Sequence, residues 1–149
     1  MSTREIEIAN RVRRILVDSP FAVLSTVGEG SEPFARWMTP VFARGDLKEF
    51  HALAAPRSRK VEHIKKNPRV AWVFSTPAWD EVVTLHGTAS IEDDPGLRAE
   101  VWERMPEKHR TFILNDDANL CCVVIATRVE RIEYLRPLEG QTVPVSLAP

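Results

Sequence analysis

Alternation of apolar and polar positions dominates this sequence and predicts a mainly β protein. Short runs rich in β-branched and aromatic residues are separated by glycine, proline and acidic turn residues, which is the pattern of strands joined by hairpins. Pro40 interrupts the second run and indicates an edge strand or a bulge there. The last run is long, and a break near Thr127 and Arg128 would divide it in two. The expected strands occupy residues 21–27, 34–43, 47–54, 69–76, 81–93 and 120–135.

Helical spacing of apolar residues is found in other segments. It predicts an N-terminal helix over about residues 3–18, with Ser2 or Thr3 as its cap. A basic helix is expected from about Ser58 to Lys66 and should end before the following Asn-Pro pair. A further helix over residues 95–105 begins with a proline, which suits a first turn. The tail, about residues 137–149, is rich in proline and small residues and is expected to be loosely tied.

Six short strands, mostly in consecutive hairpins and with few helices, favour a small antiparallel barrel over a layered α/β fold. The expected fold class is therefore mainly β (α+β), a six-stranded antiparallel barrel with flanking helices. The length of 149 residues suits a single domain over residues 1–149.

Composition and charge narrow the classes of function. Hydrophobic residues make up 44% of the chain and charged residues 28%, which is ordinary for a soluble globular protein. No apolar run approaches the ~20 residues needed to cross a bilayer, and the charged N-terminal segment does not resemble a secretory leader. Cys121 and Cys122 are adjacent and would point to opposite faces of a strand, which disfavours a disulfide between them. We therefore expect a reduced, cytoplasmic protein without a membrane partner.

One short segment concentrates positive charge. Residues 57–69 hold six cations and the single acid Glu62, whereas the whole chain sums to −1. Ser58, Arg59 and Lys60 stand where the basic helix begins, and a helix start offers free N–H groups and a positive dipole end that suit a phosphate. An amphipathic helix with its apolar side inward and its lysines solvated would show the same spacing. The residues alone therefore leave both interpretations open.

Other chemistries lack their sequence patterns. None of the four histidines occurs in HExxH or beside a cysteine at zinc-ligand spacing, so no metal site is expected. His51 and His86 fall in expected strands and are interpreted as structural, although His51 could reach a pocket at the end of its strand. Ser25 and Ser75 lack the GxSxG elbow of a hydrolase. The tryptophans could stack on a planar ligand, but buried tryptophans ordinarily belong to a core or an interface.

The order of these parts resembles a known family. The strand "FAVLSTV" is followed by "EPFARWM", by a strand leading into "SRKVEHIKKNPRVAWVF", and by "VTLHGTASIEDDP". Over roughly residues 21–134 this order resembles the FMN-binding split-barrel superfamily of pyridoxamine 5′-phosphate oxidase, and within it the general stress protein branch. The most specific piece is SRK, a few helical residues, and then NPR leading a strand. The resemblance implies a split barrel and a homodimer that binds FMN in a groove between the two barrels.

The resemblance also assigns binding residues. The positions that contact the FMN phosphate in the family match Ser58, Arg59 and Lys60 here. Those that line the isoalloxazine ring match Arg36, Trp37, Met38 and Thr39. Those along the ribityl chain match His51, Ala52, Leu53 and Ala54. Arg36 would offer a polar contact to the ring, and the next three residues would face the ring edge with backbone groups.

Three departures from the family pattern bear on the function. A hydroxyl residue often stands where this chain has Ala54, and Val82 replaces a glutamine of the oxidase, five residues before the glycine that matches Gly87. The oxidase's C-terminal motif, which holds the substrate phosphate, has no counterpart in "RPLEGQTVPVSLAP". Oxidation of pyridoxamine phosphate is therefore not expected.

The resemblance leads to one main functional expectation and two alternatives. The main one is an FMN-binding oxidoreductase-like protein that passes electrons or hydride from a small-molecule donor to a small-molecule acceptor. The flavin would carry the redox chemistry, and no catalytic residue is assigned. The alternatives are a non-catalytic flavin or haem carrier or sensor, and a deazaflavin-dependent reductase on the same barrel.

Two kinds of macromolecular partner were also considered from the sequence. A second copy of the chain would cover apolar strand faces, with Trp79 or Trp72 in the interface. A nucleic-acid role ranks last, because the basic segment lacks interleaved aromatic residues and the rest of the chain carries −6.

Overall fold

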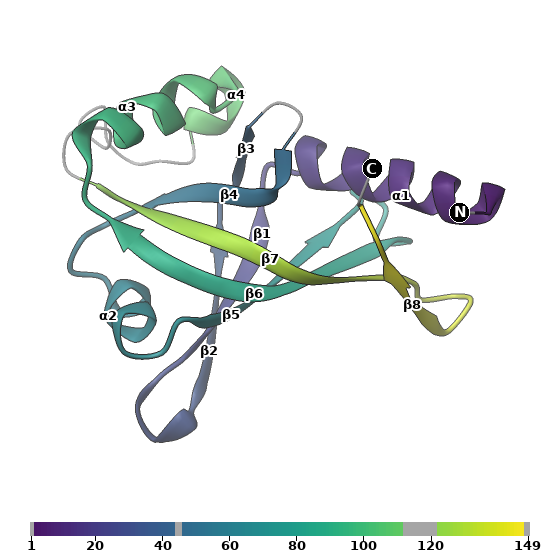
Figure 1. Cartoon of the computed structure of the whole chain (residues 1–149), viewed down its shortest axis with the longest axis horizontal. Coiled ribbons are helices and arrows are strands. Elements are labelled where there is room, and N and C mark those ends of the chain that lie inside the picture. Colours follow the sequence, from purple (N-terminus) through teal and green to yellow (C-terminus); the bar gives the residue numbers. More distant parts are fainter. Residues whose placement is uncertain (1, 44–45, 112–121, 148–149) are drawn as a thin grey trace.

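The computed structural model describes residues 2–43, 46–111 and 122–147 of the chain. Within these ranges a curled antiparallel sheet forms the body of the protein, in the order β2-β1-β5-β6-β7-β4-β3, and β8 pairs with β7. Figure 1 shows the long strands β6 and β7 crossing the middle of the molecule, with the helices around the rims of the sheet. The expected mainly β, antiparallel architecture with flanking helices is confirmed.

The strands agree with the expected runs except at two places, of which the first is Pro40. The strand before it, β2, pairs with β1, whereas the strand after it, β3, pairs with β4 at the other end of the strand order. Proline has no N–H for a ladder, so the chain ends one pairing here and begins another. The bounds are β1 (Ala22–Val27), β2 (Pro33–Met38), β3 (Val41–Ala43), β4 (Asp46–Ala54), β5 (Arg69–Ser75), β6 (Val82–Glu92), β7 (Val123–Arg136) and β8 (Gln141–Val145).

The second difference lies in the tail, which was expected to be loosely tied. Residues 141–145 form β8, which pairs with the last five residues of β7. The turn between the two strands ends at Gly140, whose φ of 73° is one that glycine adopts without steric cost. The described residues therefore form an eight-stranded sheet in place of the expected six strands.

A bulge lies in the long pairing of β6 with β7. Opposite Gly87 and His86, β7 carries one extra residue, Glu130. A methyl group at Gly87 would overlap the carbonyl oxygen of Arg128, so the backbones of the two strands approach closely at this glycine. β7 continues through the bulge as one strand, and the break considered near residues 127–128 does not occur.

The three longer helices lie where helical spacing predicts them. α1 (Thr3–Asp18) starts at Ser2, whose hydroxyl accepts from the N–H of Glu5 while the Glu5 carboxylate accepts from the N–H of Ser2. α2 (Arg59–Lys66) ends before the Asn-Pro pair, and α3 (Pro95–Arg104) begins with Pro95. Two short segments complete the helical structure: α4 (Glu107–Arg110) and the 3-10 turn η1 (Glu29–Ser31).

One apolar core fills the inside of the curled sheet. Phe50, Trp72 and Phe74 are fully buried there, with ring centroids 5.0 to 6.3 Å apart. α2 adds Val61 and Ile64, which confirms that the apolar side of the basic helix faces inward. Because Trp72 belongs to this core, the expectation that it could sit in a subunit interface is corrected.

Candidate functional site

The start of α2 differs from the starts of the other two long helices. α1 and α3 are capped by side-chain oxygens of Ser2 and Asp94. Ser58 holds the cap position of α2, but its hydroxyl donates to the carbonyl of Ala55 at 2.8 Å and makes no capping bond. In the part of the chain that the structure describes, the first N–H groups of α2 thus keep the positive end of the helix dipole open to an acceptor.

Three cations gather beside this helix start from two elements that are distant in the sequence. Arg59 and Lys60 are the first residues of α2, and Arg36 comes from the edge strand β2. The charge of Arg36 acts on Lys60, and the charge of Arg59 acts on Arg36. We call Arg36, Arg59 and Lys60 the cationic cluster. None of the ion pairs among the described residues involves any of the three.

Burial and mutual repulsion oppose the charged state in this cluster. Burial lowers the pKa of Lys60, and the nearby charge of Arg36 lowers it further. Burial also lowers the pKa of Arg36, with a further contribution from the charge of Arg59. An anion beside Arg36 and Lys60 would relieve the repulsion, because an opposite charge nearby favours the charged form of both. The cluster is therefore a candidate anion-binding site.

Arg36 is anchored on one side by the strand pair that carries it. Its Nη1 donates to the hydroxyl oxygen of Thr26 at 2.8 Å, to the carbonyl of Leu24 at 3.1 Å and to the carbonyl of Phe34 at 3.4 Å. Its Nε and Nη2 make no hydrogen bond within the described ranges. One side of the guanidinium is therefore fixed, and the other can contact a ligand.

The structure adds residues to the site that sequence reasoning missed. The guanidinium of Arg59 lies over the ring of Phe34, 4.8 Å from its centroid. The same ring packs against the imidazole of His63 at 4.7 Å between centroids, and His63 Nδ1 lies 2.8 Å from the hydroxyl oxygen of Thr26. Gly28 makes room for both rings, because a Cβ there would lie 2.5 Å from Phe34 and 3.0 Å from His63 Nε2.

Strand alternation is the signal that could have found some of these residues. Phe34 and Arg36 are two positions apart in β2, and Thr26 lies opposite Phe34 in the β1–β2 ladder, so the three share a face. No comparable signal points to His63, because its contact with Thr26 depends on how α2 docks against the sheet.

The other residues expected along the flavin ring lie in different environments. Trp37 points to the opposite face of β2 from Arg36 and is 62% exposed. Met38 is buried in the core, and Thr39 is half-buried in the link between β2 and β3. The side chains of this group are therefore not brought together, although their backbone follows one strand edge.

The residues expected along the ribityl chain alternate across β4. Ala52 and Ala54 face the main core. Leu53 packs in a second apolar cluster with residues of α3, and the charges of α3 act on His51, whose pKa is lowered chiefly by burial. The structure thus separates the side chains of His51–Ala54 onto two faces of the sheet.

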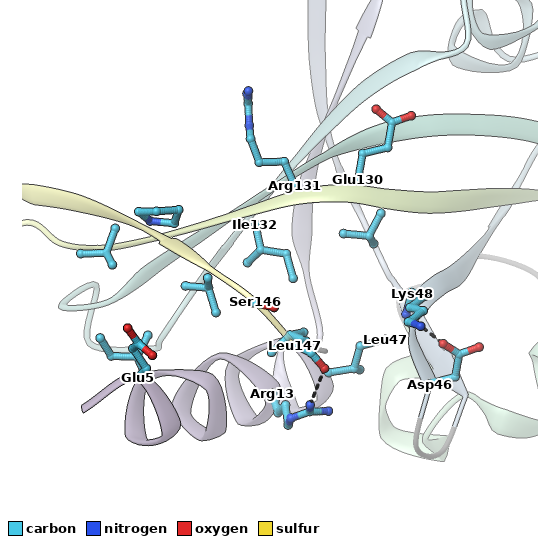
Figure 2. Close-up of a pocket in the computed structure, with 15 residues that line it drawn as sticks. Glu5, Arg13, Asp46, Leu47, Lys48, Glu130, Arg131, Ile132, Ser146 and Leu147 are labelled. Carbon is cyan, nitrogen blue, oxygen red and sulfur yellow. Dashed lines mark hydrogen bonds between the residues drawn. The ribbon is translucent and has the colours of Figure 1, made fainter. Parts of the chain in front are cut away.

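The larger of two described cavities lies away from the cationic cluster. Its volume is about 1220 Å³, and it lies between α1, the start of β4, and the strands β7 and β8 (Figure 2). Its charged lining residues are three acids and three bases, and one of these bases, Arg13, donates to the carbonyl of Leu147 at 3.0 Å. The smaller cavity, of about 290 Å³, lies along β1, β5, β6 and β7. Neither cavity is lined by a residue of the cationic cluster.

No helix among the described residues is both long enough and apolar enough to span a membrane. No group of three or more histidine, cysteine, aspartate or glutamate side chains there could hold a metal ion.

Comparison with known proteins gives one family match and several structural neighbours. A family model described as pyridoxamine 5′-phosphate oxidase matches residues 8–136. A protein from Clostridium acetobutylicum, related to general stress protein 26 of B. subtilis, has a similar structure with a TM-score of 0.76 and 20% identity, over 95% of each chain. None of the curated proteins compared with the chain gives a significant sequence match.

Two other solved structures carry names that refer to cofactors. A pyridoxamine 5′-phosphate oxidase-related, FMN-binding protein from Nostoc punctiforme PCC 73102 has a TM-score of 0.67 and 14% identity, over 100% of this chain and 99% of its own. A protein named F420 reductase has a TM-score of 0.60 and 19% identity, over 80% of this chain and 94% of its own. These likenesses show that the curled sheet is the split barrel expected from the order of the sequence elements. The family match extends from α1 to the end of β7.

Proposed function

The chain belongs to the pyridoxamine 5′-phosphate oxidase family, and on that premise we propose that it is an FMN-binding protein with oxidoreductase chemistry. In this proposal the cationic cluster and the start of α2 bind the phosphate of the flavin. The observation that supports it most is that Arg36 and Lys60 are partly buried near each other, with the exposed Arg59 beside them, while no carboxylate of the described residues pairs with any of the three.

The donor set suits a phosphate monoester in both charge and number. Two guanidinium groups and one ammonium group stand beside helix N–H groups that no side chain caps. A hydrogen bond to a charged group contributes about 1.5–3 kcal/mol, so two or three of them reach roughly 3–9 kcal/mol. That range overlaps the ~8 kcal/mol of a micromolar ligand. Ser58 would join the site by turning its hydroxyl away from Ala55.

The edge position of β2 supports the placement of the flavin ring. No described strand pairs with the outer edge of β2, so backbone groups between Trp37 and Thr39 are open to a ligand there. Arg36 would reach the ring or phosphate with Nε or Nη2. The ribityl chain would run along the end of β4, where residues 51–54 lead into the loop before α2.

When bound, FMN supplies the redox chemistry, taking hydride or electrons from a small-molecule donor and passing them to a small-molecule acceptor. The residues of the chain bind and orient the cofactor, and none is assigned to proton transfer. Pyridoxamine phosphate is not proposed as the substrate, because Val82 stands where the oxidase has a glutamine.

We further propose that two copies associate through the outer face of β1, β2 and β5. Trp37 lies opposite Val23, and Val23 lies opposite Val73, so the three side chains form one apolar row. Phe21 meets Trp37 edge to face at 6.3 Å, and both Phe21 and Val73 are 37% exposed. A second copy would cover this row.

Light scattering tests the association. We expect twice the chain mass of 16.9 kDa at micromolar concentration, and a shift toward the single mass in Trp37→Glu. Trp79 was also expected in the interface, but it lies in the turn between β5 and β6, outside the proposed apolar row. Because Trp79 is exposed like Trp37, Trp79→Glu is a matched control. A wild-type mass of 16.9 kDa would contradict the proposal.

Titration of flavin-free protein with FMN tests the phosphate site. Arg59→Ala with Lys60→Ala removes two charged contacts, and we expect the dissociation constant to rise at least ~100-fold. Lys65→Ala with Lys66→Ala removes the same charge from the other end of α2 and should change it at most a few-fold. Equal affinity of the two double variants would overturn the phosphate assignment.

The main alternatives are separated by the ligand and by turnover. A parallel titration with the deazaflavin coenzyme F420 is motivated by the F420 reductase neighbour, and tighter binding of that coenzyme would replace FMN in the proposal. Stoichiometric flavin without turnover of reduced nicotinamides, over a panel of acceptors, would instead identify a flavin carrier or sensor.

A further inference from the structure

Thr26 of β1 links Arg36 of the cationic cluster to His63 of α2. Its side chain is almost completely buried, with a relative exposure of 1%. Its hydroxyl oxygen lies 2.8 Å from Arg36 Nη1 and 2.8 Å from His63 Nδ1. One buried hydroxyl therefore joins a cation of β2 to an imidazole of α2.

The direction of the first of these hydrogen bonds follows from the protons present. A guanidinium group can only donate, so the Thr26 oxygen accepts from Arg36. The hydroxyl has one proton of its own and a second lone pair, so it can either donate to Nδ1 of His63 or accept from it. Donation to Nδ1 requires a neutral imidazole that carries its hydrogen on Nε2, and this is the arrangement that the proposal below adopts.

His63 also supports the second arginine of the cluster. Its ring packs on Phe34, and the guanidinium of Arg59 lies over that same phenylalanine ring, 4.8 Å from the centroid. A chain of contacts thus runs from Arg36 through Thr26, His63 and Phe34 to Arg59, and it contains no carboxylate. His63 is the member that touches both halves of this chain.

We propose that His63 is a positioning residue of the anion site: as a neutral imidazole it directs the Thr26 hydroxyl so that its oxygen holds Arg36, and it supports the Phe34 ring beneath Arg59. The inference rests on the proposed function, because the site it serves is the phosphate site. It adds that site's supporting layer, which does not itself touch the ligand.

The charges around His63 agree with a neutral imidazole. Arg36 faces it from β2, Arg59 and Lys66 from α2, and Glu32 from the turn before β2. Burial lowers the pKa of His63 and the three cations lower it further, whereas Glu32 raises it. Protonation would turn Nδ1 into a donor, so the Thr26 proton would lose its acceptor and the Thr26 oxygen would accept from two cations.

Paired variants of the full chain test the role of the acceptor and of the hydroxyl. Thr26→Val and His63→Leu remove one partner each, and we expect the dissociation constants for FMN and for inorganic phosphate to rise about 5- to 30-fold. Thr26→Ser keeps the hydroxyl and should stay within about 3-fold of wild type. His63→Asn keeps an acceptor near the position of Nδ1 but loses the ring that packs on Phe34, so its affinity should lie between those of His63→Leu and wild type. Lys65→Ala, on the same helix and paired with Glu62, is the control.

Nitrogen-15 NMR of the histidine side chains in the wild-type protein gives an independent readout. We expect His63 to be the Nε2–H tautomer at neutral pH, and this assignment does not depend on any ligand. An Nδ1–H tautomer or an imidazolium would overturn the inference. So would unchanged FMN and phosphate binding in both Thr26→Val and His63→Leu when Arg59→Ala with Lys60→Ala abolishes it.

The two proposals fail in distinguishable ways. If Arg59→Ala with Lys60→Ala binds FMN like wild type, the assignment of the phosphate site is wrong. The positioning role of His63 then fails with it. If that double variant loses FMN and the conservative variants Thr26→Ser and His63→Asn bind as weakly as Thr26→Val and His63→Leu, the phosphate site stands and the positioning role of His63 is overturned.

Discussion

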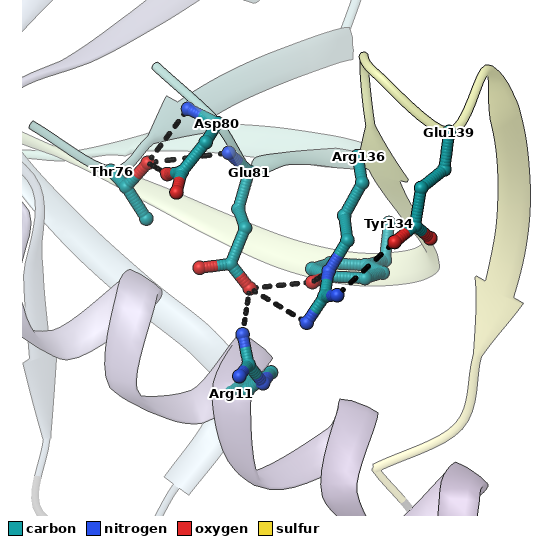
Figure 3. Close-up of polar contacts among 7 residues, drawn as sticks. All are labelled: Arg11, Thr76, Asp80, Glu81, Tyr134, Arg136 and Glu139. Carbon is teal, nitrogen blue, oxygen red and sulfur yellow. Dashed lines mark hydrogen bonds and ion pairs between the residues drawn. The ribbon is translucent and has the colours of Figure 1, made fainter. Parts of the chain in front are cut away.

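Two groups of charged side chains in this protein differ in whether their arginines are paired with carboxylates. In the cationic cluster, Arg36 and Arg59 stand with Lys60 and have no carboxylate partner among the described residues. At the other group, Arg11 and Arg136 converge on one carboxylate, Glu81 (Figure 3). We call this second group the Glu81 network.

The Glu81 network ties three elements together. Glu81 accepts from Arg11 of α1 at 2.8 Å and from the hydroxyl of Tyr134 of β7 at 2.5 Å. Arg136 donates from Nε to the Tyr134 oxygen at 2.9 Å and pairs with Glu139 at 3.3 Å. Figure 3 shows these side chains directed toward one another between the helix and the strands.

The pKa shifts of the two groups reflect this difference. Burial by itself raises the pKa of Glu81, but hydrogen bonds from Tyr134 and Arg11 and the charges of Arg11 and Arg136 outweigh it, so the pKa lies below its ordinary value. In the cationic cluster, burial and like charge both lower the pKa of Lys60. One group is satisfied within the chain, whereas the other has no carboxylate partner among the described residues, and we propose that an anion completes it. On this proposal, charge pairing separates a structural site from a binding site when both are rich in arginine.

The largest effect on stability is expected from breaking the Glu81 network. Glu81→Ala leaves Arg11 and Tyr134 without their acceptor, and we expect a loss of about 1.5–3 kcal/mol in the free energy of unfolding. Urea unfolding measures it. Glu139→Ala, an exposed surface pair with Arg136, should cost ~1 kcal/mol or less. Equal losses in the two variants would show that Glu81 is not the centre of the network.

Breaking the cationic cluster should have no such cost in flavin-free protein. Arg59→Ala with Lys60→Ala removes repulsion, so we expect the free energy of unfolding to stay the same or to rise, while Glu81→Ala keeps FMN affinity within a few-fold. A loss of stability in the double variant comparable to that of Glu81→Ala would erase the distinction between the two groups.

Inorganic phosphate should stabilise the flavin-free protein through the cationic cluster. At ten times its dissociation constant, a ligand that binds only the folded state adds about 1.4 kcal/mol. Thermal unfolding in phosphate and in chloride at equal ionic strength measures the gain. Glu81→Ala should keep the gain and Arg59→Ala with Lys60→Ala should lose it. A gain that survives in the double variant would place the anion elsewhere.

Tyr134→Phe should weaken the Glu81 network by one hydrogen bond. We expect a loss of about 1 kcal/mol in the free energy of unfolding, measured by urea. The pKa of Glu81 should also rise, because the Tyr134 hydroxyl is one of the groups that lower it. A carboxyl titration of Glu81 that does not move in Tyr134→Phe would contradict this role.

The smallest effects on the free energy of unfolding are expected from mild acid. Protonation of histidines whose pKa is lowered by burial lowers stability, whereas protonation of a histidine paired with a carboxylate would raise it. Burial lowers the pKa of His51, His63 and His109 in the folded protein. The unfolded chain therefore binds more protons just below the ordinary histidine pKa of ~6.5, and stability falls as pH drops through that region.

Glu81 belongs to a separate pH window. Its lowered pKa gives stability that is present above the ordinary glutamate value and is lost only as pH falls through the folded-state pKa. A pH series of unfolding midpoints should thus show a shallow loss that His63→Asn reduces, then a more acidic loss that Glu81→Ala reduces. Stability that rises between pH 7 and pH 6 would contradict the histidine assignments.

Much of the fold follows from patterns within short stretches of sequence. Strand alternation, the Ser2 capping box and Pro95 at the start of α3 each depend on residues a few positions apart, and the structure has these elements where they were expected. The tail was misjudged because its pairing partner, the end of β7, is recognised only when the Gly140 turn folds it back. The change of partner at Pro40 likewise depends on where β4 lies.

The sequence by itself determined the helix start that carries Ser58, Arg59 and Lys60, because a local run of residues creates both the charge and the free N–H groups. Only the tertiary structure decided that Arg36 lies beside Lys60, that Thr26 meets His63 37 positions away, and that no carboxylate of the described residues pairs with these cations. The physical reason is range: periodicity and capping act over a few residues of chain. Whether a charge is paired depends on every element that folding brings within a few ångströms of it.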